Sequence, residues 1–264
     1  MRAYFAIMKI AMKSILNNKS SVAILLLQSL VPIIVMGYLW SSILAPGQKI
    51  GGMSKNQMLV YYCGVNFINF FVWYAIDWDL NNDIHSGELS NILHRPVALQ
   101  TYYFCRMLGD RAANFLLLAP LVLLGLVYLC MHSGLAVSVI TIVKFLVNIA
   151  LTATLWFMFS YLVGCLAYWF ENLFFVLLVK EVMVSLLAGY YFPLAILPSA
   201  WRRVLNWLPF QYFGAFPVTS LIKKTSTVFW LQNVALEVIW LGIFYVLMMV
   251  ANKRGLHQYS DVRG

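Results

Sequence analysis

Apolar residues along this chain are grouped into runs long enough to cross a membrane. A helix needs about 20 residues to span roughly 30 Å of hydrocarbon. We therefore predict six membrane-spanning helices, at about 21–44, 56–76, 112–131, 135–169, 173–192 and 228–251. The fourth run is longer than a span requires, so we expect it to be tilted or to extend beyond the bilayer. The pattern predicts an all-α integral membrane protein.

The first 20 residues have an amphipathic pattern instead. At helical spacing, one face is apolar and is formed by Phe5, Met8, Met12, Ile15 and Leu16. The opposite face carries basic side chains, so we expect an interfacial helix over 1–20 that lies on the membrane surface. This mixed segment does not resemble a cleavable signal peptide. Residues 21–264 are then expected to form a single transmembrane domain.

A segment rich in proline and tryptophan, 193–227, separates the fifth and sixth runs. We expect a short extracellular or re-entrant helix there. Its apolar face would consist of Trp201, Val204, Leu205 and Leu208, while Arg202 and Arg203 face water.

Composition supports a membrane location. The chain is 62% hydrophobic and 10% charged, whereas soluble domains carry about 25% charged residues. The net charge is +9, and the basic residues flank the apolar runs. Lipid headgroups therefore explain the charge better than nucleic acid does, and we expect membrane lipids, not nucleic acid, as contacts. The four cysteines are widely separated and suggest neither a disulfide nor a metal site.

Basic residues in the loops also predict an orientation. With both termini in the cytoplasm, ten loop Lys and Arg residues lie inside and six lie outside, which favours this topology. The outside set has no acidic residue among it and consists of Lys49, Lys55, Arg202, Arg203, Lys223 and Lys224. Two interpretations of this outer-face charge remain open, namely contact with anionic headgroups of the outer leaflet and reception of an anionic exported molecule at Arg202 and Arg203.

Motifs for nucleotide binding and catalysis are missing from the chain. It has no G-x-x-x-x-G-K-[ST], no G-x-S-x-G, no H-E-x-x-H and no kinase signature. We expect it not to be an enzyme and to hold no cofactor of its own. Any ATP-driven work would need an ATPase on another chain.

The polar connector after the second run contains a possible docking helix. Gly87 and Pro96 bracket it, and Leu89, Ile92 and Leu93 make a small apolar face. A short amphipathic helix of this kind suits a groove on a soluble partner. An ordinary solvated connector is the alternative.

The sequence resembles permease subunits of the type-two class of ATP-binding-cassette exporters. The resemblance is carried by Gly-Glu-Leu at 87–89, Leu-x-Arg-Pro-Val at 93–97, the segment 189–210 with Gly189-Tyr-Tyr-Phe-Pro and Leu208-Pro-Phe, and the tail 253–264. The amphipathic N-terminal helix is similar to that family's first helix. The motifs are ordered along the whole chain.

The resemblance implies a function and partners. The chain would be the membrane subunit of an exporter, working with two cytoplasmic ATPase subunits that bind ATP and Mg, and with a second permease chain, identical or related. It implies a multi-pass protein of a bacterial cell membrane. The coupling helix to the ATPase would comprise Gly87, Glu88, Leu89, Ile92, Leu93 and Arg95. The substrate stays open.

The ionisable residues Lys180, Glu181 and Glu237 lie within apolar runs. Such groups are costly in a membrane and mark function or an internal pair. Lys180 and Glu237 are both near mid-depth at 1.5 Å per residue. We therefore favour a Lys180–Glu237 ion pair between the last two spans, with a substrate path and proton transfer as alternatives.

Two other classes of protein remain as alternatives, a secondary transporter and a membrane-embedded enzyme.

Asp77-Trp78-Asp79 matches a D-x-D metal motif, but residues two apart on a helix do not face each other. We interpret the two aspartates as a charged stop at the cytoplasmic end of the second span.

Overall fold

The computed structural model describes residues 2–17, 19–44, 48–132, 138–222 and 225–263. Within these ranges the protein is helical, without a β-strand. Two of the predicted outer lysines, Lys223 and Lys224, lie outside the described residues. In chain order the helices are α1 (Arg2–Leu16), α2 (Lys19–Ile43), α3 (Lys55–Val72), α4 (Ile76–Ser86), α5 (Glu88–Leu93), α6 (Leu99–His132), α7 (Val139–Gly164), η1 (Cys165–Tyr168), α8 (Phe174–Leu187), η2 (Leu194–Ile196), α9 (Ser199–Leu205), η3 (Pro209–Phe213), α10 (Ala215–Ile222) and α11 (Thr227–Arg263).

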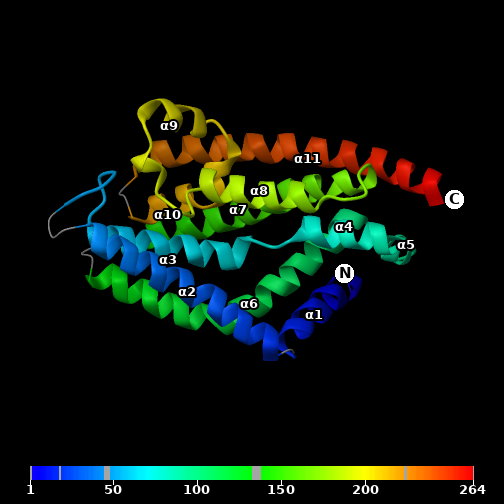
Figure 1. Ribbon diagram of the computed structural model, residues 1–264, viewed down its shortest axis with the longest axis horizontal. Helices are drawn as coiled ribbons and strands as arrows, with labels where there is room; N and C mark the ends of the chain where they lie inside the picture. The colour runs from blue at the N-terminus through cyan, green and yellow to red at the C-terminus, as the bar shows by residue number, and fades with distance from the viewer. Residues whose placement is uncertain (1, 18, 45–47, 133–137, 223–224, 264) are drawn as a thin grey trace.

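The long helices run along the long axis of an elongated bundle (Figure 1). Both chain termini and α5 lie toward one end, which we call the α5 end, and α9 lies at the other, which we call the α9 end. In the bundle α7 packs against α3, α4, α10 and α11, while α6 packs against α3 and α1. This arrangement gives the molecule two chemically different ends.

Three of the described helical stretches are long and apolar enough to cross a membrane, namely Lys55–Ser86, Val139–Tyr168 and Thr227–Tyr259. Apolar side chains on the outer faces of α2, α7, α8 and α11 are exposed, as expected for helices that face lipid. The bundle is therefore an all-α membrane protein.

The boundaries differ from the predicted spans in three places. α8 has only 14 residues, about 21 Å at 1.5 Å per residue, so the predicted span 173–192 is short. The polar connector 77–111 is almost wholly helical, because α4, α5 and the start of α6 occupy it. The last helix runs on to Arg263, where a polar tail was predicted.

Helix ends follow local signals in the sequence. At the start of α3, Ser54 Oγ accepts a hydrogen bond from Gln57 N at 3.4 Å and Ser54 N donates to Gln57 Oε1 at 3.0 Å, which is a capping box. Gly87 has φ = 82° and ends α4 while beginning α5. Left-handed backbone favours glycine, so this residue fixes the corner between the two helices.

The core has two parts along the bundle. The part toward the α9 end is centred on aromatic residues of α3, α7 and η3, such as Tyr61, Trp156 and Phe213. The part toward the α5 end joins α4, α5, the start of α6 and the end of α7, and includes Leu89, Ile92 and Tyr161. Burial of these side chains from several helices holds the short α4 and α5 in place.

The N-terminal helix α1 packs against α6. The contact is close at Gly109, where a Cβ atom would lie 2.2 Å from the carbonyl oxygen of Met8. Of the predicted apolar face, Phe5 is 69% exposed, while Met8 lies at the contact with α6. A helix thus occupies Arg2–Leu16 of the segment 1–20, for which an interfacial helix was predicted, and α6 supports it.

Candidate functional site

A buried group of charges lies where α4, α7 and α8 meet. Lys180 Nζ of α8 is 2.6 Å from Asp77 Oδ2 of α4 and 2.7 Å from Glu181 Oε1. Ser160 of α7 donates to the other oxygen of Asp77 at 2.9 Å. Asp77 is fully buried and Lys180 is 7% exposed. A lysine between two carboxylates satisfies charges that would otherwise be expensive in this environment.

The predicted Lys180–Glu237 pair was wrong. Lys180 pairs with Asp77 and Glu181, while Glu237 Oε1 accepts a hydrogen bond from Thr152 at 3.2 Å. Within the described parts of the chain no ion pair involves Glu237, and its Oε2 has no hydrogen-bond partner. Similar depth along two helices does not place side chains on facing surfaces, and the packing of α4 on α7 turns Asp77 inward instead.

The two aspartates that we interpreted as a charged stop both have cationic partners in the bundle. The two carboxylates have different partners: Asp77 binds Lys180, and Asp79 Oδ1 lies 3.2 Å from the guanidinium Nη2 of Arg106. The hydroxyl of Tyr74 donates to Asp79 at 2.5 Å. The described residues contain no group of three acidic, histidine or cysteine side chains that could hold a metal ion. The aspartates therefore act in packing between helices.

A second ionic network joins α4 to α6. Arg106 also approaches Asp83 at 3.5 Å, and Tyr103 OH donates to the same Asp83 oxygen at 2.8 Å. Because α4 and α6 enclose α5 in sequence, these contacts fix both flanks of the predicted docking helix. Sequence reasoning missed Arg106 in this role, since it lay in a stretch that we interpreted as a connector.

A cavity of about 400 Å³ lies beside the buried charges. Its walls come from α2, α3, α6 and α8, and its polar lining consists of Gln28, Tyr62, Asn66, Asn69, Arg111, Asn114, Glu181, Ser185, Tyr190 and Tyr191. Glu181 therefore belongs both to the cavity and to the group around Lys180. Trp73 Nε1 reinforces this connection by donating to Glu181 Oε2 at 3.0 Å.

Arg111 is the cationic residue of the cavity wall. It forms an ion pair with its neighbour Asp110 and donates to the backbone oxygens of Phe70 and Trp73 at the end of α3. Its guanidinium also lies 5.5 Å from the centre of the Tyr74 ring. Arg111 thus binds backbone carbonyl groups at the break between α3 and α4. These carbonyl groups would otherwise lack hydrogen-bond partners.

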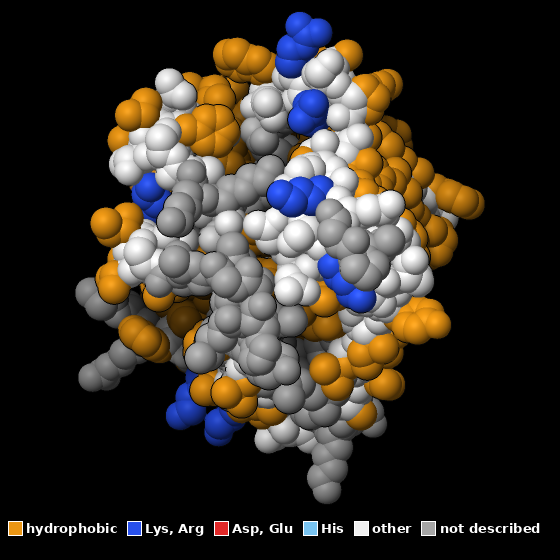
Figure 2. Space-filling view, turned by 90° about the vertical axis from the view of Figure 1, so that its left-hand side faces the viewer, with side chains coloured by type: hydrophobic (Ala, Val, Ile, Leu, Met, Phe, Trp, Pro, Cys, Tyr) orange, Lys and Arg blue, Asp and Glu red, His pale blue; other side chains and the backbone are white. Residues whose placement is uncertain are grey.

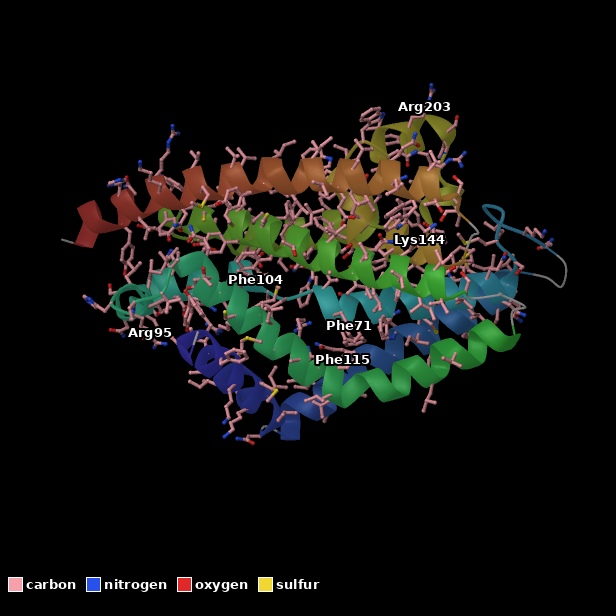
Figure 3. All side chains as sticks on the ribbon, turned by 180° about the vertical axis from the view of Figure 1, so that it is seen from behind. Phe71, Arg95, Phe104, Phe115, Lys144 and Arg203 are labelled. Atoms are coloured by element: carbon pink, nitrogen blue, oxygen red, sulfur yellow. The ribbon has the colours of Figure 1, made fainter. Side chains whose placement is uncertain are left out.

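The predicted docking helix forms, with a different apolar face. Leu89 and Ile92 are buried in the protein's own core at 0% and 2% exposure, whereas Leu93 is 42% exposed. Glu88 and Arg95 are exposed as well, and Figure 3 shows Arg95 at the α5 end. Ser90 Oγ and Tyr259 OH are 3.0 Å apart, which connects α5 to the end of α11. The surface available to a partner is therefore polar with one leucine.

Basic side chains gather at the α9 end, where Figure 2 shows Lys and Arg but no Asp or Glu. Arg202 and Arg203 are exposed on α9. Of the apolar face predicted for this helix, Leu205 is buried, whereas Trp201 and Val204 are 64% and 57% exposed. The loop between α8 and α10 raises α9 away from the bundle (Figure 1).

A family model described as ABC-2 family transporter protein matches residues 24–262. A search of curated proteins found no match to the chain.

Proposed function

The chain belongs to the ABC-2 family of transporter proteins, and from this premise we propose that it is the permease subunit of an exporter whose ATP is hydrolysed on separate subunits. The proposal includes six spans, both termini in the cytoplasm of a bacterial cell membrane, and the α9 end outside. The observation that carries it is the buried connection from α4 through Lys180 to Glu181 in the cavity wall.

The coupling step follows from this connection. α5 presents Glu88, Leu93 and Arg95 at the α5 end as the docking surface for an ATPase. Gly87 ties α5 to α4, and the first turn of α4 carries Asp77. A push on α5 would move Asp77, and through Lys180 it would move α8, whose Glu181 lines the cavity. ATP binding by the partner would thereby reshape the cavity.

The cavity suits a substrate that is neither wholly apolar nor fully charged. Tyrosine, asparagine and glutamine side chains line most of its polar surface, together with apolar residues such as Pro32, Met36 and Val184. Such a mixture binds amphipathic molecules by contact area and a few hydrogen bonds. Two permease copies, or this chain with a related one, would enclose the path between them.

The docking surface can be tested by copurification. A tagged permease carrying Leu93→Asp with Arg95→Glu is expected to insert normally and to lose its P-loop ATPase partner during purification. Leu89→Asp is unsuitable for this purpose because Leu89 is buried in the core. Lys49→Glu, an exposed charge reversal at the α9 end, is the control. Retention of the ATPase by the α5 variant would refute the docking role.

A further inference from the structure

A cavity of about 680 Å³ lies at the α9 end, separate from the cavity beside Lys180. η2, α9, α10 and the start of α11 form its walls. It is larger than the inner cavity. None of its lining residues takes part in the coupling route described above.

Two arginines give this outer cavity a positive charge. Arg202 and Arg203 both line it, and none of the other described lining residues is acidic. Neither arginine forms an ion pair with any described residue, in contrast to Arg106 and Arg111, which are paired with aspartates. A guanidinium group without an internal anion can bind an oxyanion from outside, because its donors match phosphate oxygens in pairs.

The remaining lining is suited to an amphiphile. Hydroxyl and amide side chains contribute further polar groups from Ser199, Asn206, Gln211, Thr219, Thr225, Gln232 and Asn233. Apolar residues such as Leu194, Phe216, Phe229 and Leu236 line the same cavity. A lining that mixes charged, polar and apolar side chains matches a molecule with a charged head and a hydrocarbon body.

The depth of the cavity favours a ligand from the lipid surface. Trp207 lines it and is 69% exposed, and nearby Trp201 is 64% exposed. Exposed tryptophans of this kind gather at headgroup level in membrane proteins. Trp240 Nε1 donates to the carbonyl of Trp207 at 2.9 Å. This hydrogen bond anchors the end of the α9 segment to α11.

We propose that the outer cavity binds a phosphate group carried as the headgroup of an anionic amphiphile. Arg202 and Arg203 hold the phosphate, the amide and hydroxyl groups contact its substituents, and the apolar lining residues receive the start of the hydrocarbon. The identification of this ligand with exported cargo rests on the proposed function. The binding itself does not depend on it.

Native mass spectrometry of the purified full-length permease tests the proposal. Phosphatidylglycerol is expected to remain bound, while zwitterionic phosphatidylcholine is retained less. Arg202→Gln with Arg203→Gln should lower retained phosphatidylglycerol by about tenfold or more, since both charge-assisted contacts are lost. Arg202→Lys with Arg203→Lys should retain an intermediate amount, because it keeps the charge but not the paired donors.

The matched control is Lys49→Gln with Lys55→Gln. It removes the same charge from the same end, at two exposed residues that do not line the cavity. Gln232→Glu places an acid in the cavity with both arginines intact, and it should also weaken binding. Equal losses in the lysine and arginine variants, or equal retention of the two lipids, would overturn the proposal.

An excess of inorganic phosphate tests whether the site can bind free phosphate or needs the phosphate of a lipid headgroup. Displacement of the lipid would show that free phosphate is sufficient for the site, whereas undiminished lipid binding would show that the hydrocarbon is needed. Both the binding readout and the lipid comparison are independent of ATPase copurification. A permease that binds phosphatidylglycerol without an ATPase partner would contradict the proposed function and leave the site intact.

Discussion

At the scale of single residues, the charges inside the bundle have unequal roles. Lys180 contacts carboxylates of two helices, whereas Glu237 contacts only a hydroxyl among the described residues. Breaking a buried ion pair leaves an uncompensated charge, which costs about 3–5 kcal/mol. A carboxyl without a cation loses little when it becomes an amide. We therefore predict a large loss of stability when Lys180 is replaced and a small one when Glu237 becomes glutamine.

Lys180→Met is expected to lower the free energy of unfolding in detergent by about 3–5 kcal/mol, because Asp77 and Glu181 then lack their cation. Asp77→Asn should also destabilise the protein. The double variant should lose less than the sum of the two single losses, by about 1 kcal/mol or more. Thermal unfolding of the three variants measures this coupling, and additive losses would argue against the pair.

Glu237→Gln is expected to change the free energy of unfolding by less than about 1 kcal/mol, because the amide keeps the hydrogen bond with Thr152. The comparison variant is Asp77→Asn, which replaces an equally buried acid that does have a cation. The same unfolding assay applies. Similar losses of stability in both variants would show that Glu237 has a cationic partner.

At the scale of elements, the bundle depends on a few close contacts and corners. α1 approaches α6 at Gly109 closely enough to exclude any side chain. α4 and α5 meet at the left-handed backbone of Gly87. Both are positions where a small change alters the placement of a whole helix.

Gly109→Leu is expected to separate α1 from α6. The freed helix should become several-fold more sensitive to trypsin at Lys9 and Lys13, since proteolysis needs local unfolding. Gly242→Leu is the control, because a Cβ atom there meets nothing within 4 Å. Digestion of reconstituted protein measures both. Unchanged cleavage after Gly109→Leu would show that α1 is held by other contacts.

Gly87→Ala should strain the corner between α4 and α5 by about 1–2 kcal/mol. We expect α5 to be reoriented and ATPase copurification to fall while expression is unchanged. Gly52→Ala is a matched control with φ = 76° and open space around it, located between α2 and α3 rather than beside α5. Equal ATPase recovery from both variants would mean that the corner has no part in docking.

The sequence predicted the elements better than their contacts. Long apolar runs anticipated where α2, α3, α7 and α11 lie in the sequence, and Gly87 and Pro96 bracketed α5. The burial of the Leu89 side chain and the ion-pair partner of Lys180 could not be predicted from these patterns. Both depend on how α4 packs against α7, and that packing is set by tertiary contacts between residues more than 80 positions apart in sequence.

At the scale of the whole molecule, the two ends differ in charge and in architecture. The α5 end carries both termini and the acidic residues around Arg106. The α9 end carries exposed basic residues and the larger cavity. Such a difference is expected if the ends face different compartments.

Cysteine labelling in intact cells tests this orientation. Lys49→Cys and Arg203→Cys should react with a membrane-impermeant thiol reagent before lysis, and Asn91→Cys on α5 only after it. Cys63, Cys105 and Cys165 are buried and should contribute little background, and Cys130 would be replaced by serine. Labelling of Asn91→Cys in intact cells would reverse the topology.

The unbroken length of α11 has a mechanical consequence. Thr227 lies near the outer cavity and Tyr259 touches α5, so a single helix of about 48 Å at 1.5 Å per residue separates them. A rigid rod behaves as a lever: a tilt of about 5° moves one end by about 4 Å relative to the other. Force applied at α5 would then shift Phe229 and Gln232 against α9, and the size of the outer cavity would follow the angle of one helix.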